Sequence, residues 1–183
     1  MRIAYVCQTY PPEISGAAAF TQNLAEGMTA RGHRVLVIAA SDRGSAYAGD
    51  TPMLRLSRLR SYRNPMRKGQ RFAPWPLHRM RQEFQTFAPE VVHVSDVLQA
   101  ALAGVIATAE RHVPSVLTTH QLPWFVSPHV PAIGGLRTAF EDSLWSYARW
   151  LARRYTSLVS PSHAVAEEVA RRTGLLPQVI SSG

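Results

Sequence analysis

The sequence has very little cysteine and no long apolar segment. Its 183 residues include one cysteine, Cys7, so the chain cannot close an internal disulfide or pair thiols around a metal ion. Because Cys7 lies within an apolar run, we expect it to be a buried core thiol. The apolar run after Arg2 is too short for a signal peptide, and no stretch approaches the ~18 apolar residues of a membrane span. These absences predict a cytoplasmic protein, either soluble or attached peripherally at the inner face of the membrane.

Several diagnostic motifs are missing as well. No GxGxxG follows the first apolar run and no GxxxxGK[ST] occurs anywhere, which argues against dinucleotide oxidoreductases and P-loop hydrolases. The seven histidines show neither HExxH nor another metal-binding spacing, so we expect no metal site. Internal repeats and low-complexity linkers are absent too, and with 46% hydrophobic residues the chain is long enough to form one domain.

Acidic residues are absent from one segment of the chain. Residues 51–82 hold nine of the 20 basic residues and no Asp or Glu, and the rest of the chain is nearly neutral. The cations alternate with apolar and aromatic side chains, as on a surface that lies on anionic lipid, where each basic residue contributes ~1 kcal/mol. The same mixture would attract a polyanion such as nucleic acid, or form a solvated loop without a partner. The residues predicted to form a membrane surface are Arg58, Arg60, Arg63, Arg67, Lys68, Arg71 and Trp75.

What the sequence does contain is an alternation of apolar runs and amphipathic segments. Runs of strand-forming residues predict strands at 2–7, 35–40, 53–59, 91–94, 113–119, 157–160 and 178–180. Helical periodicity predicts helices between them at 16–31, 77–87, 97–111, 136–155 and 162–173. This alternation predicts an α/β fold, a Rossmann-like doubly wound parallel sheet of about seven strands with helices on both faces.

The candidate site lies where loops of this sheet should meet. Ligands of an open parallel sheet bind beyond the carboxyl ends of the strands, where the strand order reverses. The loops expected there are 8–16, 95–96 and 120–121. At the start of a helix, Gly16 would let a phosphate approach free backbone N–H groups, although it could equally serve only the turn. At a strand end, His120 could donate to a sugar hydroxyl or a phosphate, or be structural.

Two further residues near these loops have structural interpretations. Asp96 precedes a predicted helix, so its carboxylate suits a helix cap, and a cap facing the crevice could also meet a ligand. His93 lies inside an apolar strand, which favours a core residue or one that supports the site from behind.

Four segments together carry a family resemblance. They are MRIAYVCQTYPPEISGAAAFTQNLAEGMTARGHRVLVIA, PEVVHVSD, PSVLTTHQ and LVSPSHAVAEEV. In this order and spacing they resemble glycosyltransferase family 4 across essentially the whole chain. The resemblance implies a two-domain GT-B enzyme in which residues 1–183 form the N-terminal, acceptor-side domain. The C-terminal donor-binding domain would be absent from this chain, which stops abruptly on a strand, so this chain alone is expected to be inactive.

The resemblance also implies a reaction and its residues. The reaction would be a metal-independent, retaining transfer of a hexose from a UDP- or GDP-sugar to an acceptor hydroxyl, with the nucleotide sugar as co-substrate and no cofactor. His120 matches the histidine that contacts the transferred sugar, and Gly16 the glycine that meets the donor diphosphate. The flanking residues of that phosphate loop are Ser15, where many members have a second glycine, and Ala17. The residues expected to bind the acceptor are Tyr10, Asp96 and Gln121.

The acceptor is the least determined part of the expectation. The first loop and the segment TTHQLPWFVSPHVP are similar to members that glycosylate membrane lipids such as diacylglycerol or phosphatidylinositol. With the basic segment, this favours a lipid acceptor, and soluble sugars or a polysaccharide stay open. The expected partners are the nucleotide-sugar donor, the acceptor, the chain's own C-terminal domain and an anionic membrane surface, with no nucleic acid among them. The competing hypothesis is a non-enzymatic nucleotide- or polyanion-binding module.

Overall fold

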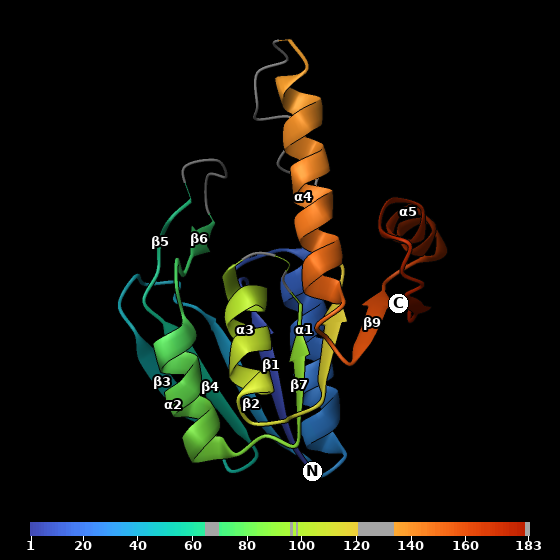
Figure 1. Cartoon of the computed structure of the whole chain (residues 1–183). Coiled ribbons are helices and arrows are strands. Elements are labelled where there is room, and N and C mark those ends of the chain that lie inside the picture. Colours follow the sequence, from blue (N-terminus) through green and yellow to red (C-terminus); the bar gives the residue numbers. More distant parts are fainter. Residues whose placement is uncertain (65–69, 96, 98, 121–133, 182–183) are drawn as a thin grey trace.

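The structure, a computed structural model, describes residues 1–64, 70–95, 97, 99–120 and 134–181. A central sheet is flanked by helices on both faces (Figure 1). In chain order the elements are β1 (Arg2–Cys7), α1 (Gly16–Ala30), β2 (Arg34–Ala40), β3 (Tyr47–Asp50), β4 (Leu54–Leu59), β5 (Tyr62–Arg63), β6 (Arg71–Phe72), α2 (Leu77–Phe87), β7 (Val91–Val94), α3 (Gln99–Ala109), β8 (Ser115–Thr118), α4 (Leu136–Ala152), β9 (Ser157–Ser160), α5 (His163–Thr173) and β10 (Gln178–Val179).

The large sheet has the order β10-β9-β8-β7-β1-β2-β4-β3. Seven of its strands pair in parallel, which confirms the predicted doubly wound sheet. The strand order reverses at β1, which lies between β2 and β7. The eighth strand, β3, pairs antiparallel with β4, and β5 and β6 form a separate two-stranded sheet; neither was predicted. The sequence of β3 is short and mostly exposed, so it lacks the apolar run by which the other strands are detected.

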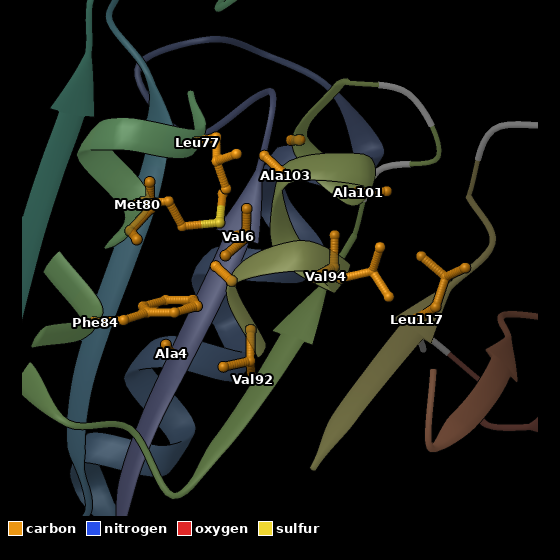
Figure 2. Packing of buried hydrophobic residues seen from close by; sticks show 14 of the residues in the cluster. Ala4, Val6, Leu77, Met80, Phe84, Val92, Val94, Ala101, Ala103 and Leu117 are labelled. Atoms are coloured by element: carbon orange, nitrogen blue, oxygen red, sulfur yellow. The ribbon is translucent and has the colours of Figure 1, made fainter. Parts of the chain in front are cut away.

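The two faces of the sheet are covered by different helices. Successive strand residues point to opposite faces, so Tyr5 and Val37 pack on the α1 side. Figure 2 shows the other face, where Phe84 and Met80 of α2 point toward Ala4 and Val6 of β1. Such burial contributes about 25 cal/mol for each Å² of apolar surface removed from water, which makes these two layers the main source of stability.

Side chains and a glycine define the ends of two helices. Ser15 caps α1 by accepting from the N–H of Ala18, with an oxygen–nitrogen distance of 3.1 Å. Ser162 caps α5 in the same way through the N–H of Val165 at 3.3 Å. Gly174 ends α5 with a φ of 70°, a left-handed conformation that strains residues with a Cβ atom.

Two elements extend past the carboxyl edge of the sheet. Figure 1 shows that the N-terminal half of α4 and the β5–β6 hairpin both project on this side of the molecule. Within the described ranges, no helix combines the length and the apolar character needed to cross a membrane.

Candidate functional site

The three predicted loops begin at one edge of the sheet. Strands β8, β7 and β1 are adjacent and parallel, so their carboxyl ends, and the residues that follow them, lie together. The ring of Phe20, one turn into α1, lies 4.5 Å from the ring of His120, measured between centroids. Gly16 and His120 are therefore on the same edge, as predicted. Asp96 and Gln121, the other predicted residues of these loops, lie outside the described residues.

The start of α1 is open toward solvent. Gly16 is exposed, has no positive φ, and has no described atom within 4 Å of the place where a Cβ would lie. The glycine is therefore required neither by the turn nor by packing. The N–H groups of Gly16 and Ala17 belong to the first turn, where a helix supplies no backbone acceptor. Ser15 stabilises this end, because its hydroxyl contacts Thr9 Oγ1 at 3.3 Å in addition to capping the helix.

Arg58 contradicts its assignment to a membrane surface. Its side chain is 2% exposed and donates to the carbonyl oxygen of Ala40 at 2.8 Å and to those of Tyr10 and Pro11. The guanidinium also lies 5.3 Å from the centre of the Tyr10 ring. The prediction was wrong because β4 is an inner strand whose carboxyl end lies under the first loop. Arg58 therefore holds the loop that leads to Gly16.

Tyr10, which the sequence predicted to bind the acceptor, is buried. The side chain is 8% exposed and packs with the apolar cluster beneath α1. Burial raises the pKa of its hydroxyl, so it stays protonated at neutral pH.

Two histidines lie on the same side of the sheet as Phe20. His93 Nε2 is 2.6 Å from Thr118 Oγ1, and burial, with a smaller contribution from His120, lowers the pKa of His93 to about 4. The His120 side chain is half-buried, and burial lowers its pKa as well. Both imidazoles are therefore neutral at pH 7, in the form that has one donor and one acceptor nitrogen.

Four buried polar atoms at this edge have no hydrogen-bond partner among the described residues. They belong to residues at or just beyond the carboxyl ends of β1, β4, β7 and β8, and are Glu13 Oε1, Arg58 Nε, Ser95 Oγ and His120 Nε2. Unpaired buried polar groups are rare and cost about 1–3 kcal/mol each, so each of these atoms is a point that a ligand or water would complete. Burial also raises the pKa of Glu13, opposed by the nearby charge of Arg58.

Sequence reasoning missed Glu13 and Phe20. An acidic residue in a proline-containing loop carries no spacing signal. Phe20 belongs to the apolar face of its helix, and the sequence does not show that this face meets two histidines.

Three of the nine cations of the basic segment, Arg55, Arg79 and Arg81, pair with acids from elsewhere in the chain. Glu83, 2% exposed, contacts Arg55 at 3.1 Å and Arg79 at 2.8 Å and accepts from Ser57 Oγ at 2.8 Å. Arg81 pairs with Glu110. These contacts explain why a run of cations without acids folds into a compact structure.

Of the predicted membrane residues, some face solvent and some do not. Arg71 is another correction, because its guanidinium is half-buried and donates to Ser61 Oγ at 2.8 Å and to the Ser61 carbonyl at 3.0 Å. Arg60, Arg63 and Trp75 are exposed, the last by 55%. Arg67 and Lys68 lie outside the described residues.

Over the part of the chain that the structure describes, no group of three or more His, Cys, Asp or Glu side chains is arranged to hold a metal ion. The groups at this edge without a partner among the described residues are instead a carboxylate, a guanidinium, a hydroxyl and an imidazole, and the first turn of α1 adds backbone N–H groups. This set suits hydrogen bonding to phosphate and sugar oxygens.

The sequence is similar to those of known glycosyltransferases. The chain is 28% identical over 120 residues to the alpha-monoglucosyldiacylglycerol synthase of Acholeplasma laidlawii, covering 66% of this chain and 30% of that protein. It is 27% identical over 175 residues to a GDP-mannose-dependent alpha-mannosyltransferase of Mycobacterium tuberculosis, covering 92% of this chain and 44% of that protein. The chain thus spans less than half the length of these relatives.

A solved structure shares the fold. The sucrose-phosphate synthase of Thermosynechococcus elongatus superposes with a TM-score of 0.66 at 16% identity, over 98% of this chain and 47% of that one. The sequence profile described as Glycosyltransferase Family 4 matches residues 14–183. The chain therefore belongs to Glycosyltransferase Family 4.

Proposed function

We propose that these 183 residues are the acceptor-side half of a retaining glycosyltransferase that uses a UDP- or GDP-sugar, the donor-binding half lying outside them. The observation that carries this proposal is the buried Nε2 of His120, which has no hydrogen-bond partner among the described residues and lies on the same edge as the open start of α1. The chain covers 30% and 44% of two relatives whose names describe sugar transfer, which leaves room for a second half in the complete gene product.

The start of α1 would bind the donor diphosphate. The N–H groups of Gly16 and Ala17 lie in the first turn, at the positive end of the helix, and among the described residues no atom lies within 4 Å of where a Cβ of Gly16 would be. Negative charge grows on the diphosphate as the sugar leaves. Fixed donors aimed at that charge lower the barrier, because they need no reorganisation during the reaction.

His120 would hold the transferred sugar. A neutral imidazole can donate to a sugar oxygen through Nε2, or accept from a hydroxyl, and either bond would satisfy a buried atom that has no partner among the described residues. Fixing the sugar next to the diphosphate restricts it to reactive orientations.

Kinetics of the complete gene product test this role. We expect His120→Ala to lower kcat/KM about 100-fold or more, within the range typical of a positioned catalytic group. The matched control is His78→Ala, which removes an exposed histidine on α2 and should leave turnover unchanged. Wild-type turnover in His120→Ala, with the fold retained, would remove the imidazole from the chemistry.

For the acceptor we propose a lipid in an anionic membrane, which the protein binds peripherally. Arg60, Tyr62, Arg63 and Trp75 are exposed around the β5–β6 hairpin, on the side where the candidate site opens. The diacylglycerol-related name of one relative points the same way. The names of the GDP-mannose-dependent relatives state a donor and no acceptor, so a soluble sugar or a polysaccharide is the second candidate.

Vesicle binding distinguishes the two acceptor classes. Replacing Arg60 and Arg63 with glutamine should weaken binding to anionic vesicles about 30-fold at low salt, since each cation contributes ~1 kcal/mol. Replacing Arg34 and Arg111, exposed residues that lie away from this hairpin, is the control. Equal vesicle affinity of the two double variants, or turnover of a soluble acceptor alone, would exclude the membrane surface.

A further inference from the structure

One aromatic ring of α1 links the proposed diphosphate site to the proposed sugar site. The Phe20 ring lies edge-on to the His120 ring, with centroids 4.5 Å apart and planes at 67°. It meets His93 in the same manner at 6.3 Å and 82°. Phe20 follows Gly16 by one helical turn, so the helix end that would bind phosphate and the ring that touches the imidazole belong to one rigid element.

The fold places these rings together for a simple reason. Thr118 is the last residue of β8, and its side chain lies on the α1 side of the sheet with His93; His120, two residues later, lies on that side too, because its ring contacts Phe20 of α1. His93, in the neighbouring strand, points to the same side, because its imidazole reaches Thr118 there. Helix α1 covers this side, and Phe20 is the residue through which it contacts both imidazoles.

Hydrogen bonds fix one of the two imidazoles and not the other. His93 is held by Thr118 at 2.6 Å and packs against the ring of Tyr5, with centroids 5.5 Å apart. Nε2 of His120 has no partner among the described residues, and its backbone N–H bonds to the Thr118 carbonyl at 3.2 Å. The orientation of the His120 ring therefore depends on packing, and Phe20 supplies the ring contact.

We propose that Phe20 is the positioning residue that orients the His120 imidazole toward the transferred sugar. The Phe20 ring also packs against His93, whose position Thr118 fixes through a hydrogen bond. The Phe20 ring therefore restricts the His120 imidazole on one side. The inference rests on the proposed function, because orienting His120 matters only if His120 contacts the sugar.

The chain offers a matched set of variants. Phe20→Leu removes the ring and keeps an apolar side chain, and Phe20→Tyr keeps the ring. Leu24→Ala changes the next turn of α1, where the side chain packs against the core beneath the helix. All three are made in the complete gene product, and thermal unfolding establishes that each one folds.

Kinetics give the first measurement. Misplacing a reacting group by about 1 Å can cost 100-fold in rate, so we expect Phe20→Leu to lower kcat at least 10-fold with the donor KM within about 2-fold. Phe20→Tyr should retain wild-type kcat. Leu24→Ala should lower the unfolding temperature without changing kcat, since it affects only packing. A wild-type kcat in folded Phe20→Leu overturns the proposal.

Histidine NMR gives a second measurement, which needs no substrate. With ¹³C at the histidine Cε1 positions, the His120 signal is assigned by its loss in His120→Ala. The Phe20 ring current should shift this signal in wild type and Phe20→Tyr, and Phe20→Leu should abolish the shift. An unchanged signal in Phe20→Leu refutes the contact. Wild-type turnover in His120→Ala refutes the proposed function instead, so the two failures are distinguishable.

Discussion

Replacing Arg58 with methionine removes a buried guanidinium and keeps most of the apolar length of the side chain. In the native protein this group donates to three backbone carbonyls, those of Ala40, Tyr10 and Pro11, at 2% exposure. The variant leaves the carbonyls without these donors. Because the first loop is held to β4 through them, its connection to the sheet is weakened in the same step.

The expected loss follows from the number of acceptors. An unsatisfied buried polar group costs about 1–3 kcal/mol, and relief from burying the charge offsets part of the total. If about two carbonyls stay unpaired, the free energy of unfolding falls by ~3 kcal/mol. For a domain of this size that corresponds to a melting temperature about 6–12 °C lower.

Urea and thermal unfolding, followed by circular dichroism, measure this loss. The control is Arg60→Met, which removes an exposed arginine two residues along the chain and should change stability by less than about 0.5 kcal/mol. If Arg58→Met unfolds at the wild-type midpoint, or if both variants lose the same stability, Arg58 does not hold the first loop.

Two further predictions concern packing and pH. Gly104→Ala should lower the free energy of unfolding by about 1–3 kcal/mol, because its Cβ would lie 3.1 Å from Val94 Cγ2 and 3.2 Å from the Tyr155 hydroxyl. The control, Gly27→Ala in α1, should be neutral or stabilising. Equal melting temperatures of the two variants would contradict this packing. Burial lowers the pKa of His93 from 6.5 to about 4, so the unfolded state binds more protons between these values. The free energy of unfolding should fall by about 3 kcal/mol as pH drops through this window, and His93→Gln should flatten this part of the stability–pH curve.

The parallel core of the fold could be predicted because its elements carry strong local signals. Strands such as β1 and β2 are unbroken apolar runs, and Ser15, Ser162 and Gly174 are residues whose chemistry defines helix ends. Strand β3 carries no such signal, since its pairing is imposed by β4 and most of its residues face solvent. Helix α4 ends at Ala152, whereas the predicted end was Tyr155. The prediction ran too far because the apolar periodicity continues past the last helical turn.

The candidate site was only partly predictable. The position of His120 on the same edge as Gly16 follows from parallel topology, which the sequence indicates. The burial of Arg58 and the contact of Phe20 with His120 depend on how loops and helices cross in space, and no spacing records that. Charge alone did not show how residues 51–82 are used, because Glu83 and Glu110, which pair with three of the nine cations, lie outside that segment.

A crystal structure of the complete gene product with its nucleotide sugar tests the central claim most directly. We expect the diphosphate to bind to the N–H groups of Gly16 and Ala17, and the sugar to lie within hydrogen-bond distance of His120 Nε2. A nucleotide sugar bound at the amino edge of the sheet, or one that leaves His120 without contact, would contradict it.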